Sequence, residues 1–437
     1  MSTFSVIPRG DLPDDKQASS ELFNKQFQPL EVMGTHKYKQ LVYQTQSPFQ
    51  KISIWDHHDY YEDSYSREVT RSLFLDHVLQ SNVDDEEKYH EILVHPAFVA
   101  SSKPVKRVLI VGGGEGGTLR ECLKWKSVET VTMVEIDKEV ITASRKYLPS
   151  YSNCTGFGTP DCFDDKRLEL FTVDFFDWFE EVFGDNICEE QDNKDIQANL
   201  YDIIILDLLD VEELPEGEPW AADLYSSSFF QRISCALRPS GVLVTNFGEA
   251  PENSFEFGSN IQKSDPAEIV RFNMFRNKIE KIQAMSSHFV RFNVYDHFVP
   301  SFRGQWAFAI GIGPTKSAVL TGQIGRKAIG KADTDTLFYG TPEEVNLKLR
   351  SGLKPGVHPL NFYSGTIQNS FKYPTAGWDD VYCKSNRDTC NALKQKGFLS
   401  FKCNGNNSDV LLDDSGNQDI LYVSIFLLSS SMIKLLP

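Results

Sequence analysis

The sequence has fewer basic residues than nucleic-acid binding needs. Its 44 Lys and Arg residues are outnumbered by 61 Asp and Glu residues, and the formal net charge is −17. Because nucleic-acid-binding proteins neutralise phosphates with clustered basic side chains, this balance argues against a nucleic-acid partner. A small cationic ligand fits an acidic protein better, although the same charge also serves simply to keep a protein in solution.

The sequence also has no CxxC pair among its eight cysteines. The scattered spacing predicts neither a zinc ribbon nor a disulfide framework, and a reducing, cytoplasmic compartment is expected. The polar start MSTFSVIPRGDLPDDK lacks the apolar stretch of a signal peptide. Residues 420–437 are mostly apolar but contain four serines and Lys434, which makes them a short and poor membrane span. No membrane association is expected.

Composition divides the chain into five parts. Residues 1–34 are polar and rich in Pro and Gly, which predicts a disordered leader. Residues 35–100 contain short alternating runs such as LVYQTQ and FQKISIWDH, which predict a small N-terminal antiparallel β domain followed by a helical connector. Strands and helices alternate over residues 101–326, the predicted catalytic domain. Residues 327–385 are expected to extend this domain, and residues 386–437 to form a loosely ordered tail.

The alternating part predicts an α/β fold with a Rossmann-like, doubly wound parallel sheet, as in adenosylmethionine-dependent methyltransferases. VKRVLIVGG, ETVTMVEID, LELFTVD and YDIIILDLLD have the composition of buried strands, and helical segments such as TLRECLKWK separate them. Residues 185–199 are polar and are expected to form a surface insertion. In such a sheet the ligand lies outside the carboxyl ends of the strands, so the residues that follow each strand are candidate site residues.

The segment GGGEGG has GxGxxG spacing through Gly112, Gly114 and Gly117 and lies between a predicted strand and a predicted helix. Glycines there allow a ligand to approach the backbone closely, although such turns also occur for packing reasons alone. Glu135 ends the next strand, 21 residues after Gly114, where a carboxylate can accept both hydroxyls of a ribose. Together these features favour a nucleoside ligand but do not separate a nicotinamide dinucleotide from an adenosyl sulfonium compound.

Acidic side chains follow four successive predicted strands. They indicate which of the two ligands, the nicotinamide dinucleotide or the adenosyl sulfonium compound, is bound. A carboxylate inside the glycine loop, Glu115, would repel a pyrophosphate, which favours the sulfonium compound. Asp174 ends the third strand and could accept from an adenine amino group. The fourth strand ends in D-L-L-D with Asp207 and Asp210.

The position of Glu115 predicts that the sulfonium compound is decarboxylated S-adenosylmethionine. Methyltransferases that use S-adenosylmethionine usually have an acid two residues before the first loop glycine, and that position is Ile110 here. A carboxylate at Glu115 suits a ligand that carries an ammonium and lacks a carboxylate of its own, because two neighbouring carboxylates repel. Decarboxylated S-adenosylmethionine has this charge pattern.

Asp207 is the candidate catalytic base. A primary ammonium, with an ordinary pKa of about 10.4, must lose a proton before its nitrogen attacks carbon. Asp207 is placed to accept that proton, and Asp210 could hold the amine group that does not react. Taken alone, D-L-L-D predicts a helix cap or turn equally well.

Over residues 45–315 the sequence closely resembles the polyamine aminopropyltransferases, the family of spermidine, spermine and thermospermine synthases. The most specific segments are LDHVLQSNVDDEEKYHEILVHPAF and RVLIVGGGEGGTLREC. The resemblance implies a Rossmann-like enzyme without a metal, usually a homodimer, that uses decarboxylated S-adenosylmethionine and a polyamine. It implies that the donor-binding residues are Gln50, Gly112, Gly113, Gly114, Glu115, Gly116, Gly117, Glu135, Ile136, Asp174 and Phe175. It implies that the amine-binding residues are Gln80, Tyr89, His90, Glu115, Asp207, Asp210 and Tyr225, with Asp207 as the base.

The sequence differs from the spermidine synthase pattern at positions that bear on the identity of the acceptor amine. Spermidine synthases commonly have Asp in the glycine loop and Tyr in a TYPSGQ segment, where this sequence has Glu115 and Phe302. The YHE and VPSF segments are more similar to thermospermine synthases, which predicts transfer to spermidine to give thermospermine or spermine. The loop at residues 211–225 is longer than in spermidine synthases, and it either covers the donor or is an exposed acidic loop without a role.

Three alternatives remain open at the level of sequence. The first is a spermidine synthase that acts on putrescine. The second is a methyltransferase that consumes S-adenosylmethionine itself, against which Glu115 and Ile110 argue. The third is a non-catalytic binding module on the same fold, which would have no need for Asp207.

Overall fold

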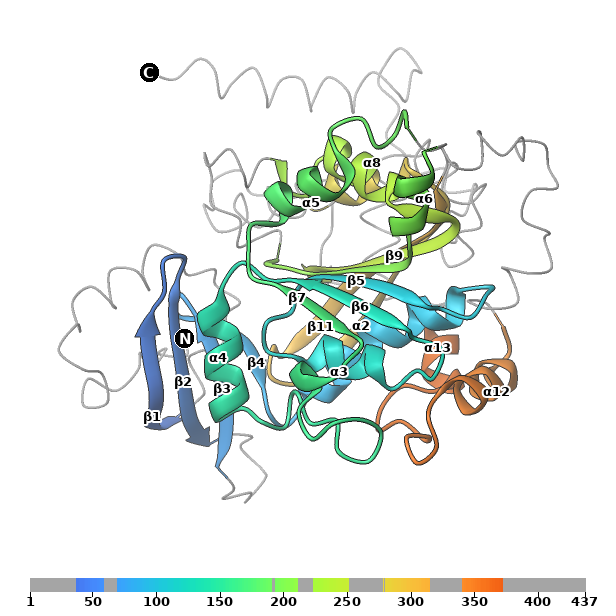
Figure 1. Ribbon diagram of the computed structural model, residues 1–437. Helices are drawn as coiled ribbons and strands as arrows, with labels where there is room; N and C mark the ends of the chain where they lie inside the picture. The colour runs from blue at the N-terminus through green and yellow to red at the C-terminus, as the bar shows by residue number, and fades with distance from the viewer. Residues whose placement is uncertain are drawn as a thin grey trace, which may run out of the picture.

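The computed structural model describes residues 37–58, 69–190, 193–210, 223–250, 278, 280–314 and 340–371. The predicted leader, most of the acidic loop after Asp210 and the predicted C-terminal tail lie outside these residues. Two sheets organise the described chain, a small one near the N-terminus and a larger one that carries most of the helices (Figure 1).

The small sheet is antiparallel and has the strand order β1-β2-β3-β4. Its strands are β1 (Lys37–Gln46), β2 (Lys51–His58), β3 (Thr70–Leu75) and β4 (Val78–Asn82). Apolar side chains of the sheet, including Ile52, Ile54 and Leu73, pack with Val140 and Ala143 of helix α4 (Lys138–Tyr147). The predicted small antiparallel β unit is therefore confirmed, and α4 joins it to the larger sheet (Figure 1).

The large sheet has the order β10-β11-β9-β8-β5-β6-β7. Its strands are β5 (Arg107–Gly112), β6 (Thr130–Val134), β7 (Leu168–Phe171), β8 (Tyr201–Asp207), β9 (Leu237–Glu249), β10 (Phe289–Val299) and β11 (Gly304–Pro314). Strands β5 to β9 are parallel, which confirms the predicted Rossmann-like fold. The sheet also has an antiparallel part, because β11 pairs antiparallel with β9 and forms a hairpin with β10. A short turn between β10 and β11 reverses the chain without a crossover helix.

Helices cover both faces of the large sheet (Figure 1). One face carries α5 (Phe175–Phe183), α6 (Lys194–Asn199) and α8 (Ser227–Cys235), and the other carries α2 (Glu86–Ala100) and α3 (Gly117–Leu123). A 3-10 turn, η2 (Cys162–Asp164), precedes β7. Helix α2 is the predicted connector, and it packs on α3 and on the large sheet. No helix in the described part of the chain is both long and apolar enough to cross a bilayer.

The C-terminal extension packs beside α2. It contains α12 (Pro342–Gly352) and α13 (Gly365–Ser370), and α12 contacts α2. The buried carboxylate of Glu91 on α2 accepts backbone N–H bonds from Asn361 at 3.0 Å and from Phe362 and Tyr363 at 2.7 Å. Lys348 of α12 donates to the carbonyl of Val99 at 3.0 Å. The extension is therefore joined to the helix that leads into the large domain.

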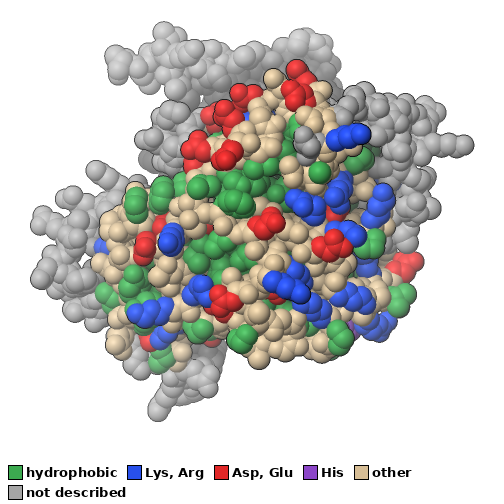
Figure 2. Space-filling view, in the orientation of Figure 1, with side chains coloured by type: hydrophobic (Ala, Val, Ile, Leu, Met, Phe, Trp, Pro, Cys, Tyr) green, Lys and Arg blue, Asp and Glu red, His purple; other side chains and the backbone are tan. Residues whose placement is uncertain are grey.

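The surface charge is uneven on the face shown in Figure 2. Asp and Glu side chains gather towards the top of this view, and Lys and Arg side chains are spread over its lower and right-hand parts. The described part of this face does not form a continuous basic stripe of the kind that follows a phosphate backbone.

The structure corrects the expectation that the cysteines form no disulfides. Cys154 is bonded to Cys162, and Cys188 is bonded to Cys235. The second bond joins the polar insertion predicted at residues 185–199 to the end of α8. That insertion also contains the short helix α6, whose Ile196 is buried in the core. Spacing did not predict the second pairing, because the fold brings together two cysteines that are 47 residues apart in the sequence.

Reduction of these bonds tests the correction. A disulfide that closes a loop stabilises the fold by restricting the unfolded chain, and the effect grows with the loop. For a separation of 47 residues we expect Cys188→Ser to lower the free energy of unfolding by about 4 kcal/mol. For a separation of 8 residues Cys154→Ser should cost about 2.5 kcal/mol. Denaturant titrations of the wild-type protein and of each variant measure the two free-energy changes. A variant as stable as the wild-type protein would show that its cysteine is not bonded.

Candidate active site

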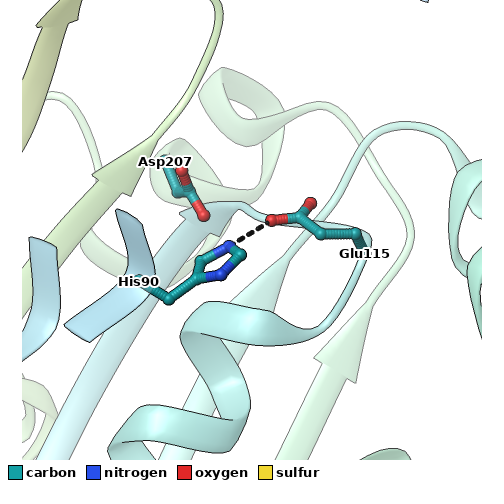
Figure 3. A group of neighbouring side chains, drawn as sticks. All are labelled: His90, Glu115 and Asp207. Atoms are coloured by element: carbon teal, nitrogen blue, oxygen red, sulfur yellow. Dashed lines mark hydrogen bonds and ion pairs between the residues drawn. The ribbon is translucent and has the colours of Figure 1, made fainter. Parts of the chain in front are cut away.

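Three side chains from distant parts of the sequence converge at one edge of the large sheet. His90 extends from α2, Glu115 from the glycine loop between β5 and α3, and Asp207 from the end of β8 (Figure 3). One ligand atom from each lies within 4.8 Å of the other two. The order of the strands reverses between β5 and β8, and the crevice outside such a reversal is where ligands bind in open α/β sheets.

Two glycines of the loop are needed because the site is crowded. Gly112 has a φ of +81°, and a Cβ there would lie 2.1 Å from the backbone oxygen of Asp207. A Cβ on Gly117 would lie 2.3 Å from Cε1 of His90. The glycine loop therefore permits close contact with the backbone of Asp207 and with the side chain of His90, in addition to any approach by a ligand.

Asp207 is held by a chain of hydrogen bonds. Tyr89 donates its hydroxyl to Oδ1 of Asp207 at 3.1 Å, and Thr118 donates its hydroxyl to Oδ2 at 2.7 Å. Asn246 on β9 donates through Nδ2 to the Tyr89 oxygen at 2.8 Å and to Oδ1 of Asp210 at 3.1 Å. Since Tyr89 accepts from Asn246, its own hydrogen points at Asp207. Asn246 thus supports both acids of D-L-L-D, Asp210 directly and Asp207 through Tyr89.

Sequence reasoning missed Asn246 and Thr118. The signal for Asn246 was available, because VLVTNFG places a polar residue in the fifth parallel strand near its carboxyl end, as Asp207 is placed in the fourth. Thr118 follows the glycine loop directly and gave no signal of its own, since Thr is ordinary in the first turn of a helix.

The pKa values of the cluster suit proton transfer near neutral pH. Burial and the negative charge of Glu115 raise the pKa of Asp207 to about 6, although His90 and the bonds from Thr118 and Tyr89 oppose this rise. Burial and the nearby charge of Asp207 keep the pKa of Tyr89 well above its ordinary value, so this hydroxyl remains a donor. A carboxylate with a pKa near the working pH is able to accept a proton and release it again.

The cluster is better suited to an ammonium than to a metal ion. His90 directs Nδ1 to Glu86 at 2.8 Å and Nε2 to Glu115 at 2.9 Å, so both ring nitrogens already face carboxylates. A metal ligand needs a neutral imidazole with a free lone pair. Glu115 and Asp207 offer carboxylate oxygens, which accept the hydrogen bonds of an ammonium directly.

Glu135 and Gln50 lie on the donor side of the predicted site. Glu135 follows β6, is 7% exposed, and accepts the backbone N–H of Asp137 at 2.8 Å. Burial raises its pKa to about 7, the bond from Asp137 opposes this, and the charge of Glu115 adds to it. Gln50, at the start of β2, donates to Oδ2 of Asp137 at 3.0 Å. The small sheet therefore reaches the residues that follow β6.

Asp174 caps a helix in this structure. One of its carboxylate oxygens accepts the backbone N–H of Phe176 at 2.7 Å, at the start of α5. Phe175 packs against the core cluster beneath the same helix, and Ile136, next to Glu135, is 38% exposed. The predicted donor-binding residues after β6 and β7 thus combine polar groups with an exposed apolar side chain.

Two more predicted amine-binding residues are Gln80 and Tyr225. Gln80 is half-buried on β4 in the small sheet. Tyr225 is fully buried and donates its hydroxyl to the carbonyl of Leu209 at 3.1 Å. Tyr225 therefore supports the segment between Asp207 and Asp210, and its predicted contact with an amine stays a prediction.

Comparisons with known proteins agree with this fold and arrangement. The spermine/spermidine synthase domain matches residues 86–266. The polyamine aminopropyltransferase of Prochlorococcus marinus (strain NATL1A) is 35% identical over 223 residues, which are 51% of this chain and 64% of that protein. The polyamine aminopropyltransferase of Pyrobaculum calidifontis is 35% identical over 265 residues, 61% of this chain and 73% of that protein.

A solved structure shows the same similarity. The spermidine synthase from Thermotoga maritima has a TM-score of 0.50 and 25% sequence identity, and the match covers 77% of this chain and 85% of that one. The chain belongs to the polyamine aminopropyltransferase family. It spans slightly less than two thirds of the length of the Prochlorococcus relatives that it matches.

Proposed function

We propose that this protein transfers the aminopropyl group of decarboxylated S-adenosylmethionine to an amine of a polyamine. The observation that carries the proposal is the meeting of Glu115 and Asp207 beside His90 at the switch point of the sheet. Two carboxylates and one imidazolium leave a single net negative charge, which one primary ammonium neutralises. Family membership and the names of the relatives support the same reaction.

The site residues have separate roles in this proposal. Glu135, with Gln50 nearby, holds the ribose, while Asp174 and Ile136 border the adenine. Glu115 binds the ammonium of the aminopropyl group. The glycine loop lies against the sulfonium portion of the donor.

Asp207 removes a proton from the attacking amine. The nitrogen then bonds to the aminopropyl carbon next to sulfur, the carbon–sulfur bond breaks, and its electron pair returns to sulfur to give methylthioadenosine. Asp210 holds the acceptor at an amine that does not react. Tyr89 and Thr118 keep the carboxylate of Asp207 oriented towards the attacking amine.

We infer that the acceptor is spermidine. The ring of Phe302 lies 6.2 Å from that of Tyr89 and 4.4 Å from that of Trp306, between centroids, so an apolar wall borders the acceptor side of Asp207. Such a wall suits the methylene chain of a longer amine. Purified protein is incubated with labelled donor and putrescine or spermidine, and the products are separated by chromatography. Turnover of putrescine alone would contradict this choice of acceptor, and methylation of any acceptor would contradict aminopropyl transfer.

We further propose a cytoplasmic homodimer, as the family resemblance implies. Cys154 and Cys162 are fully buried, which would slow the reduction of the disulfide between them in a reducing compartment. Sedimentation of the purified protein and fractionation of cells that produce it test the two parts separately.

The pH dependence of kcat/KM for the amine tests the role of Asp207. Protonated Asp207 cannot act as a base, so we expect kcat/KM to fall as the pH decreases through about 6. The bond from Thr118 lowers the pKa of Asp207, so Thr118→Val should move the inflection to higher pH. Circular dichroism at each pH excludes acid unfolding. An inflection at the same pH in both proteins would assign it to another group.

A further inference from the structure

We propose that His90 is a positioning residue that stays protonated, held by the buried Glu86–Arg120 ion pair, and that it acts by orienting Glu115 and balancing its charge. It is not a direct contact of the substrate. The inference rests on the proposed function for its consequence, but its structural part can be measured without activity.

The hydrogen bonds of the ring require the charged form. A neutral imidazole has one N–H, whereas His90 meets a carboxylate oxygen at each ring nitrogen, Glu86 at 2.8 Å and Glu115 at 2.9 Å. The ring is 1% exposed and is enclosed by Gly117 and by the ring of Tyr151 at 6.3 Å. A substrate could therefore reach the carboxylate of Glu115 but not the imidazole behind it.

Glu86 is itself fixed by a two-point ion pair. Arg120 of α3 donates through Nη1 to Oε1 of Glu86 at 2.7 Å and through Nη2 to Oε2 at 2.9 Å. The same guanidinium bonds to Glu121 at 2.8 Å and to the carbonyls of Ser150 and Tyr151 at 3.1 Å. A paired, fully bonded guanidinium holds a buried carboxylate in one orientation. Glu86 therefore presents a permanent negative charge to His90.

Charged and titratable groups from every neighbouring element act on His90. Glu86 belongs to the same helix, Glu115 to the glycine loop, Asp207 to β8 and Arg120 to α3; the hydroxyl-bearing neighbours are Tyr89 and Tyr151. Burial alone would lower the pKa of His90, but the bonds to Glu115 and Glu86 outweigh it and raise this pKa to about 10.

The protonated ring has two effects on the acids. Its charge lowers the pKa of Asp207 and so opposes the rise that Glu115 causes. It also holds Oε1 of Glu115, and no other residue in the described part of the chain bonds to that side chain. Oε2 of Glu115 is thereby left for the ammonium of the aminopropyl group.

The direct test is nuclear magnetic resonance of the full chain with ¹⁵N-labelled histidine. We expect both ring nitrogens of His90 to show protonated shifts from pH 6 to 8. The signal is assigned by its loss in His90→Gln, or by substituting the other histidines in turn if that variant does not fold. A ring nitrogen without a proton in the wild-type protein at pH 7.5 would overturn the proposal.

The functional test compares Glu86→Gln with Glu86→Asp. In Glu86→Gln the ring loses one anionic partner, so His90 should titrate between pH 6 and 8. The KM for the donor should then rise roughly tenfold to hundredfold on the alkaline side, the range expected for a lost bond to a charged group, while kcat at saturation changes little. Glu86→Asp should restore most of the affinity. Glu87→Gln, a neighbouring acid on α2 outside the cluster, serves as the control.

The outcomes separate this inference from the proposed function. A protonated His90 in a protein that transfers no aminopropyl group would leave the structural inference standing and contradict the function. Normal transfer by a protein with a neutral His90 would contradict the structural inference and leave the proposed function standing. A donor KM that does not depend on pH in folded Glu86→Gln would have the same meaning. If Glu86→Gln does not fold, the wild-type titration still decides whether His90 is charged.

Discussion

Replacing Asp207 by Asn should lower kcat/KM for the amine by about 10²- to 10⁴-fold, the range for loss of a general base. The amide has nearly the shape of the carboxylate, and one of the two hydroxyls that bond to Asp207, those of Thr118 and Tyr89, can still donate to its single oxygen. It cannot, however, take a proton from the attacking ammonium. Steady-state rates with each amine, measured at a saturating donor concentration, give this number.

The matched control for Asp207→Asn is Asp202→Asn. Asp202 lies on the same strand, β8, at its opposite end, where it bonds to Arg238 at 2.7 Å and to backbone N–H groups of Lys106 and Arg107. Its loss should affect stability and leave the rate of the folded protein unchanged. If Asp207→Asn kept the wild-type rate, or if both variants lost activity equally, Asp207 would not be the base.

Replacing Glu115 by Gln should raise the KM for decarboxylated S-adenosylmethionine by about 30- to 3,000-fold. Removing one member of a buried, hydrogen-bonded charge pair costs about 2–5 kcal/mol, and each 1.4 kcal/mol is about a tenfold change. The same change should reduce the preference of the protein for decarboxylated S-adenosylmethionine over S-adenosylmethionine. The methionine carboxylate of S-adenosylmethionine would no longer face an acid in the variant. Calorimetric titrations in which the two sulfonium compounds compete for the protein measure this preference.

The control for Glu115→Gln is Glu129→Gln, which removes an exposed acid paired only with Lys106 on the surface. Surface pairs contribute little, so donor binding should be unchanged. Equal affinity of Glu115→Gln and the wild-type protein for the donor would show that the ammonium binds elsewhere.

The order and type of the main elements could be predicted from the sequence because the hydrophobic pattern of a buried parallel strand is local. VLIVG, VTMVE and DIIILD are each short apolar runs that end at a Gly or an acid, and each became a strand with its polar residue at the ligand edge. The antiparallel hairpin β10–β11 was not predicted, because strand direction depends on which neighbour a strand pairs with, and its own composition does not encode that.

The acidic residues of the site could be predicted for the same reason. The residues that form hydrogen bonds and ion pairs with the site could not. Glu115, Glu135 and Asp207 lie at the carboxyl ends of strands or within three residues after them, so topology alone brings them to one edge. The partners Arg120 and Asn246 lie on other elements, and only the packing of helices on the sheet sets their distances. Tyr225 illustrates the limit, since its bond to the carbonyl of Leu209 depends on packing that the sequence pattern does not encode.

The three N–H bonds from residues 361–363 to Glu91 have a practical consequence for shortened forms of the protein. A chain that stops at the end of the last strand, Pro314, would look complete as a Rossmann-like domain. It would nevertheless remove the three N–H donors from a buried acid one residue after His90. Expression limits chosen from the sheet alone would therefore disturb the helix that carries the active-site histidine.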